Sequence, residues 1–135
     1  MANFIHVGTI LNLNIYSGTN VLHFARKVGV RRVIYSSSSS IAGNGTGPTN
    51  PYALQKMVTE LECKLYSELY RVETVGLRYF NVYSETQKAH GAYATAISNW
   101  MQFIKEGKVP FITGDGTQRR DMLHLKDAVS ANIFA

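Results

Sequence analysis

A short apolar run that passes directly into five serines constrains the fold more than any other part of this chain. Val33-Ile34-Tyr35 is β-branched and aromatic, has no polar alternation, and is followed at once by the serines at residues 36–40. A run of this kind predicts a strand that is covered on both faces, as in a parallel sheet. The rest of the chain can then be tested for the helices that such a sheet requires.

Two helical patterns flank the run. Residues 20–28 place apolar side chains at helical spacing, after a Ser or Thr cap expected near residues 17–19 and before Gly29, which is expected to end the helix. Asn50 is a typical cap for the second helix, and Pro51 suits its first position. Apolar residues then recur over about five turns, at Leu54, Met57, Val58, Leu61, Leu65 and Leu69.

The alternation continues along the chain. Further strands are predicted at residues 3–7, 73–78, 111–113 and 122–125. Further helices are predicted over residues 92–106 and from Lys126 onward, and loops over residues 41–50 and 79–90. Strands that alternate with helices imply βαβ crossovers and a parallel sheet covered by helices. We therefore expect one α/β domain over residues 1–135, or part of one.

Composition limits the class of protein. With 45% hydrophobic and 17% charged residues, the sequence is that of an ordinary soluble globular protein, and no apolar run reaches the roughly 18 residues of a membrane helix. The start lacks the basic lead and long apolar centre of a signal peptide. The single cysteine, Cys63, cannot form an internal disulfide, which favours a reducing cytoplasm. The histidines show no metal-ligand spacing, so no metal site is predicted.

The net charge of +5 permits an anionic partner. The basic residues are scattered, with no aromatic-interleaved stripe and no nucleic-acid motif. We therefore expect a phosphorylated small molecule as the partner, and neither nucleic acid nor a membrane.

Tyr52 and Lys56 form the most suggestive chemical pair. Residues four apart on a helix lie on the same face, one turn from each other. A nearby ammonium favours the phenolate, and a phenol that ionises more readily is a better base near neutral pH. In an open α/β sheet, ligands bind beyond the carboxyl ends of the strands, where the serines and residues 79–81 also fall. The pair therefore has neighbours suited to a catalytic site.

Four motifs, in order, resemble those of the NAD-dependent epimerase/dehydratase family, the extended short-chain dehydrogenases that act on nucleotide sugars. They are Val33–Ser39, Pro51–Lys56, Gly76–Val82, and Gly114-Asp115-Gly116 with Arg120-Asp121. Residues 91–94 followed by Trp100 are similar to the bacterial UDP-N-acetylglucosamine 4-epimerases. The resemblance implies a UDP-sugar 4-epimerase, an isomerase that uses NAD and commonly forms a homodimer.

The resemblance also implies roles for individual residues. The catalytic residues would be Ser38, Tyr52 and Lys56. Tyr52, Lys56 and Tyr79 would contact the cofactor NAD. The UDP-sugar would be bound by Ser38, Asn81, Thr95, Ala96 and Arg120.

The family's first motif, a G-x-x-G-x-x-G turn that binds the cofactor pyrophosphate, is not found in this sequence. The expected fold is therefore a partial Rossmann-like parallel sheet flanked by helices, lacking the N-terminal glycine-rich βα unit, and the 135 residues alone are expected to be inactive. A dehydratase or reductase of the family and a non-catalytic paralogue that binds nucleotide sugar remain alternatives. No acidic residue directly follows Ser38, which favours an epimerase over a dehydratase.

Overall fold

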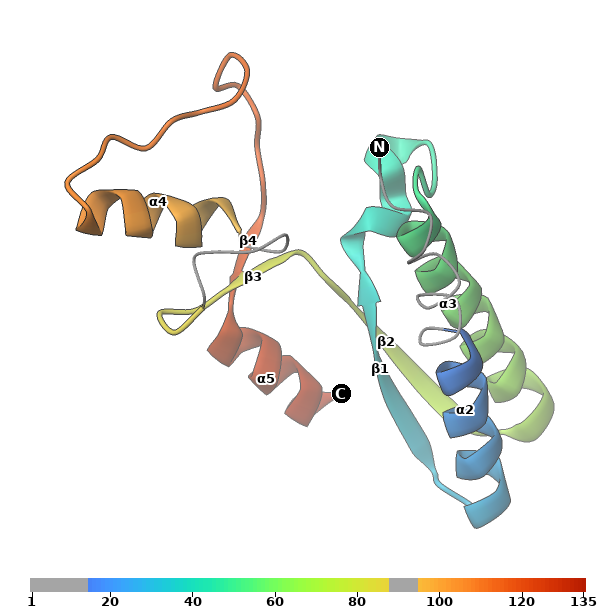
Figure 1. Cartoon of the computed structure of the whole chain (residues 1–135). Coiled ribbons are helices and arrows are strands. Elements are labelled where there is room, and N and C mark those ends of the chain that lie inside the picture. Colours follow the sequence, from blue (N-terminus) through green and yellow to red (C-terminus); the bar gives the residue numbers. More distant parts are fainter. Residues whose placement is uncertain (1–14, 88–94) are drawn as a thin grey trace. The chain divides into compact units, whose positions relative to one another are not determined.

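We analysed a computed structural model of the chain, which describes residues 15–87 and 95–135 (Figure 1). The chain divides into two compact units, Met1–Tyr79 with Ala135 and Phe80–Phe134, which are described separately below. The predicted strand at residues 3–7 lies outside the described residues. The assignment of residues 1–135 to a single partial domain stays a prediction.

The first unit is a parallel β–α–β arrangement. Strands β1 (Arg32–Ser38) and β2 (Glu73–Tyr79) pair in parallel, and helix α3 (Pro51–Tyr70) connects them. The register places Ser38 opposite Tyr79, so both strands end at the same edge. The predicted α/β class and parallel pairing are confirmed.

Helix α2 (Ser17–Val28) packs beside α3 (Figure 1) and buries Leu22 and Ala25. It ends as predicted at Gly29, whose left-handed backbone (φ 74°) glycine adopts at little cost. The predicted Ser or Thr cap is wrong. Tyr16 occupies the cap position with helical backbone angles and no side-chain cap bond, because the chain already turns helically at residues 15 and 16.

The start of α3 follows the sequence signals. Asn50 has an extended backbone, its Oδ1 accepts the N–H of Ala53 at 2.9 Å, and Pro51 holds the first position. The apolar stripe that predicted this helix, however, does not form its buried face. Ala53, Gln55 and Cys63 are buried, whereas four of the predicted positions are exposed: Leu54, Leu61, Leu65 and Leu69.

Among the described residues of the first unit, α3 packs against one face of β1, and cover of the other face stays a prediction. Tyr35 and Ser37 face α3, and Ile34 on the other face stays 39% exposed. The Tyr35 ring lies across Gly76 of β2, where a Cβ would come within 2.5 Å of the phenol end of the ring. Burial, followed by the nearby Cys63 and Glu60, raises the pKa of Tyr35 to about 12.

The segment after β1 is more ordered than predicted. Residues 41–50 were expected to form a loop, but Ser39–Gly45 forms a 3₁₀ helix, η2, with Ile41 buried. Ser38 caps it, and the left-handed residues Gly43 and Asn44 bend it before Gly45. A capping serine and a glycine that accepts positive φ therefore make a short helix possible here.

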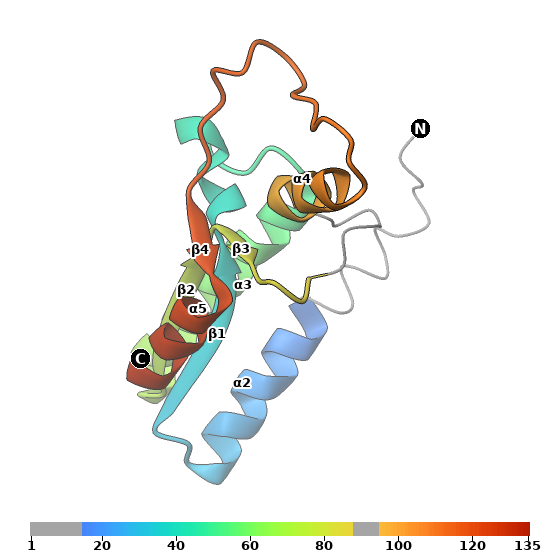
Figure 2. The same ribbon diagram turned by 90° about the vertical axis from the view of Figure 1, so that its left-hand side faces the viewer.

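The second unit contains a second parallel pair. Strands β3 (Asn81–Tyr83) and β4 (Met122–His124) pair in parallel, and α5 (Leu125–Phe134) continues directly from β4 (Figure 2). Helix α4 (Ala96–Lys105) lies between the two strands in the sequence. Residues 81–83 were predicted within a loop; they form a strand because residues 122–124 give them a hydrogen-bonded partner.

Two further boundaries differ from the prediction. Helix α4 begins at Ala96 rather than residue 92, since Thr95 has an extended backbone and serves as the cap; residues 92–94 lie outside the described residues. Residues 111–113 are not a strand, and no described strand pairs with them. The predicted turn at Gly114–Gly116 is present, with φ angles of 86° and 79° at the two glycines. Among the helices described, none combines the length and apolar character of a membrane span.

The Tyr35–Gly76 contact predicts that Gly76→Ala destabilises the protein. The added methyl group would meet the end of the Tyr35 ring, and overpacking of this kind costs about 1–3 kcal/mol. Urea unfolding would measure the loss. Gly18→Ala in helix α2 is the matched control, because a Cβ there would make only an ordinary contact, at 3.7 Å, with the Thr59 side chain of α3. Equal stability of the two variants would contradict the prediction.

Candidate active site

Ser38 is the last residue of β1 and the cap of η2. Its Oγ accepts the N–H of Ser40 at 3.2 Å and lies 2.8 Å from the Ser40 hydroxyl. The two bonds hold the Ser38 side chain at the carboxyl edge of the sheet, beside Tyr79 in the parallel register. A half-buried hydroxyl at this edge can bond a ligand oxygen.

Tyr52 and Lys56 occupy the first two turns of α3. The Lys56 ammonium lies 5.8 Å from the centroid of the Tyr52 ring and donates a hydrogen bond to the Ser36 carbonyl at 2.9 Å. Burial lowers the pKa of Lys56. Tyr52 remains 43% exposed. The lysine therefore connects the tyrosine to the end of β1, and the phenol stays accessible.

The structure thus brings four of the predicted residues to one edge of the first unit: Ser38, Tyr52, Lys56 and Tyr79. Two of them end paired strands, and the other two lie in the opening turns of the helix that packs on those strands. Their roles stay predictions.

A carboxylate one turn beyond Lys56 was missed by the sequence analysis. Glu60 Oε1 accepts the Ser37 hydroxyl at 2.5 Å and Arg78 Nε at 2.8 Å, while Oε2 accepts Arg78 Nη2 at 2.6 Å. Ser37 belongs to β1 and Arg78 to β2, so Glu60 ties both strands to α3. The four-residue spacing from Lys56 could have indicated it, because residues so spaced share a helix face.

The second unit holds a pocket of about 790 Å³ against one side of α4. The helix contributes Ala96, Asn99, Trp100 and Phe103. Residues 111–122 complete the lining, with Arg120 and the β4 residue Met122 among them. We call this the α4 pocket. It combines aromatic rings with a guanidinium group, which suits a ligand that has both a flat ring and a negative charge.

The predicted substrate residues of the second unit differ in their placement. Ala96 and Arg120 line the α4 pocket. The Thr95 hydroxyl caps α4, accepting the N–H of Ser98 at 3.4 Å and lying 3.2 Å from Gln87 Oε1. Asn81 donates its side-chain amide to the Asp121 carbonyl at 3.0 Å. Thr95 and Asn81 thus already make structural hydrogen bonds, and their part in binding stays a prediction.

Comparison with known proteins identifies the family. The family model "NAD dependent epimerase/dehydratase family" matches residues 1–135. The chain therefore belongs to this family, whose cofactor is NAD.

Three similar proteins illustrate which kinds of protein the chain resembles. A putative UDP-glucose 4-epimerase of Methanocaldococcus jannaschii is 33% identical over 92% of this chain and 44% of its own length. A UDP-N-acetyl-α-D-glucosaminuronate decarboxylase of Bacillus cytotoxicus is 32% identical, over 89% of this chain and 41% of its own. The UDP-N-acetylglucosamine 4-epimerase structure from Methanobrevibacter ruminantium superposes with a TM-score of 0.86 at 34% identity, over 90% of this chain and 43% of that one.

The chain spans less than half the length of each of these relatives. The structural match confirms the partial Rossmann-like fold with parallel strands flanked by helices.

The Glu60 bonds predict a pH-dependent stability. The hydrogen bond from Arg78, opposed by burial and aided by Ser37, lowers the pKa of Glu60. The folded state is therefore stabilised at a pH above the ordinary carboxyl pKa, and this contribution is lost as the pH falls through the lowered value. Replacing Glu60 by Gln should cost about 2 kcal/mol at neutral pH and flatten the decline in stability with acid.

Urea unfolding at a series of pH values would measure both effects. Glu68→Gln is the control, because the Glu68 side chain is exposed and its carboxylate lies at the longer distance of 3.9 Å from the Lys64 ammonium. If Glu60→Gln and the unmodified chain lost stability in parallel on acidification, the assignment would be wrong.

Proposed function

We propose that this chain supplies the base and the nucleotide-sugar side of a UDP-sugar 4-epimerase. The observation that carries the proposal is the position of Lys56, whose ammonium lies 5.8 Å from the centroid of the Tyr52 ring and donates a hydrogen bond to the Ser36 carbonyl near the end of β1. A structural role for the lysine alone would not require an accessible phenol beside it.

In the proposed reaction, Tyr52 takes the proton of the sugar 4-hydroxyl, and Ser38 holds the same oxygen by a hydrogen bond. The Lys56 ammonium stabilises the negative charge on the phenol oxygen. Lys56 and Tyr79 would hold the nicotinamide end of NAD, and the cofactor would supply a hydride acceptor for C4 and the return of that hydride to the opposite face of the sugar. Tyr52 then gives its proton back to the new 4-hydroxyl.

The residues at this edge fit the nicotinamide end of the cofactor. The Lys56 ammonium uses one donor on Ser36 and has two more to offer a ribose, and Tyr79 ends the neighbouring strand. The pyrophosphate end requires a G-x-x-G-x-x-G turn, which is not among these 135 residues. We therefore propose that the 135 residues by themselves do not turn over substrate.

The α4 pocket is the proposed site for the UDP group. Trp100 and Ala96 offer a flat apolar wall for the uracil ring, and the Arg120 fork can bond two diphosphate oxygens. Thr95 at the cap of α4 and Asn81, the first residue of β3, are proposed to contact the same ligand at its margins.

A dehydratase or reductase of the same family is the second candidate. The residues after Ser38 favour the epimerase, since Ser39, Ser40 and Ile41 provide no carboxylate for a second acid–base step. A non-catalytic paralogue would bind a UDP-sugar without NAD, which calorimetry can test.

Replacing Tyr52 by Phe should abolish epimerisation while leaving the fold intact. The test requires the chain to be joined to the amino-terminal cofactor unit of a relative, with conversion of UDP-glucose and UDP-N-acetylglucosamine measured by NMR. Because the base is lost, we expect the rate to fall by about 10²–10⁴-fold.

Tyr66→Phe on the same helix is the matched control, since Tyr66 packs against Tyr70 away from the predicted residues. Full activity of the Tyr52→Phe variant would remove Tyr52 from the mechanism.

We further propose that the first unit forms a homodimer through α2 and α3. Both helices carry exposed apolar stripes. They consist of Val21, Phe24 and Val28 on α2, and Leu61, Leu65 and Leu69 on α3. Apolar stripes on packed helices are suited to a bundle with a second copy.

Replacing Leu65 by Glu should convert the dimer to a monomer, because a charge would have to be buried in the interface. Sedimentation velocity at several protein concentrations would measure the change. Ile104→Glu, at an exposed apolar residue of α4, is the control and should leave the dimer intact. A monomeric unmodified chain would contradict the proposed interface.

A further inference from the structure

His124, the last residue of β4, contacts three separate groups. Its Nε2 lies 3.3 Å from Glu85 Oε1, and its ring packs edge-on against Tyr83 with centroids 5.3 Å apart. Its Nδ1 accepts the N–H of Lys126, in the first turn of α5, at 3.2 Å. Only 22% of the side chain is exposed. His124 therefore makes several specific contacts although it is not among the residues that line the α4 pocket.

The two ring nitrogens have different tasks. Because Nδ1 accepts a hydrogen bond, the proton of the neutral ring is assigned to Nε2, which can donate it to the Glu85 carboxylate. In this tautomer the ring can cap α5 and bond Glu85 at the same time. A backbone hydrogen bond and then the His124 bond lower the pKa of Glu85, which keeps the carboxylate ionised as an acceptor.

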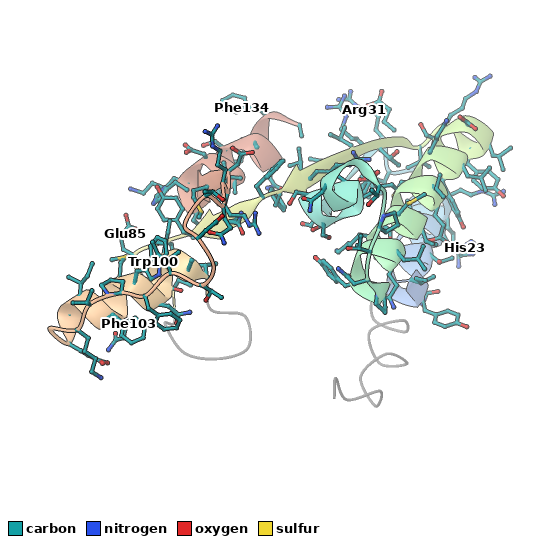
Figure 3. All side chains as sticks on the ribbon, turned by 90° about the horizontal axis from the view of Figure 1, so that it is seen from above. His23, Arg31, Glu85, Trp100, Phe103 and Phe134 are labelled. Carbon is teal, nitrogen blue, oxygen red and sulfur yellow. The ribbon has the colours of Figure 1, made fainter. Side chains whose placement is uncertain are left out.

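Glu85 belongs to a short segment that lies along α4. Ser84, Glu85 and Gln87 share a small cavity with Ser98 and Met101 of the helix, and Gln87 Oε1 lies 3.2 Å from the hydroxyl of the capping Thr95. Figure 3 shows Glu85 together with Trp100 and Phe103 of α4. The segment thus supports the side of α4 that faces away from the pocket.

The pocket lies between α4 and residues 111–122, the segment that leads into β4. Ala96, Asn99 and Trp100 form the helix wall, and Met122, two residues before His124, belongs to the strand wall. The His124–Glu85 contact adds a side-chain link to the backbone pairing of Tyr83 with His124. It connects the β4 end of the segment that lines the pocket to residues 84–87, which bond the cap of α4 through Gln87 and Thr95.

We propose that His124 is a positioning residue for the α4 pocket: by holding Glu85 to the end of β4, it fixes the separation of the two pocket walls. The ligand of this pocket, UDP, rests on the function proposed above, but the contacts that define the pocket walls do not. Two readouts, one with ligand and one without, keep the two proposals separable.

The variants separate the tasks of the two nitrogens. His124→Asn places an acceptor where Nδ1 is and so keeps the α5 cap, but the side chain is too short to bond Glu85. His124→Gln reaches Glu85 with its amide and gives up the cap. Glu85→Ala removes the partner at a residue whose side chain is 76% exposed, so the fold should tolerate it. His23→Asn, at an exposed histidine of α2, is the control.

The readout without ligand is iodide quenching of Trp100, the single tryptophan of the chain, which lines the pocket. We expect His124→Asn and Glu85→Ala to alter quenching to the same extent, and His124→Gln and His23→Asn to match the unmodified chain. Calorimetry with UDP should show affinity about threefold to tenfold weaker in the first two variants.

Unchanged quenching in His124→Asn and Glu85→Ala would overturn the positioning role. A quenching change in His124→Asn but not in Glu85→Ala would do the same, because the effect would then not pass through Glu85. If the unmodified chain failed to bind UDP, the proposed nucleotide site would fall, while Trp100 quenching would still decide the role of His124.

Discussion

One carboxylate holds the first unit in register. Glu60 receives hydrogen bonds from Ser37 on β1 and from Arg78 on β2, and it does so from the helix that connects those strands. A charge-assisted fork of this kind fixes orientation as well as distance. Together with the Lys56 bond to the Ser36 carbonyl and the buried Ala53 and Cys63, this bond fixes which face of α3 meets the described strands of the first unit.

The orientation of α3 against the strands determines where the predicted catalytic side chains lie. Lys56 lies one turn before Glu60 on the same face, where it meets the Ser36 carbonyl, and Tyr52 lies one turn earlier still at the edge. At the end of β1, the Ser38 side chain is held because it caps η2. The position of Tyr52, the proposed base, therefore follows from the contacts that Lys56 and Glu60 make further along the helix.

Local signals in the sequence were sufficient for part of this structure. Asn50 and Pro51 determine the start of α3, and Gly29 the end of α2, because caps act through neighbouring backbone groups. The parallel pairing followed from the apolar run at residues 33–35. The candidate pair Tyr52 and Lys56 came from helical spacing and the candidate Ser38 from motif resemblance; neither could provide the contacts of these side chains.

What the sequence could not provide depends on partners distant in the chain. The leucine stripe of α3 indicates a helix, yet only the sheet decides that Ala53 and Cys63 face inward instead. The strand at Asn81–Tyr83 exists because residues 122–124 pair with it, and residues 111–113 are irregular although their composition suits a strand. From the sequence, Glu60 is indistinguishable from a solvated helix residue, because only the folded chain brings Ser37 and Arg78 into contact with it.

The faces of α3 have a consequence for how this helix can vary among related chains. One side meets the sheet, another carries exposed leucines, and the first turns carry Tyr52 and Lys56. Inserting or deleting one residue rotates everything beyond it by about 100°. A single insertion between Lys56 and Glu60 would leave one of the two groups facing the sheet and turn the other away. The spacing between Lys56 and Glu60 along α3 is therefore constrained independently of which residues lie between them.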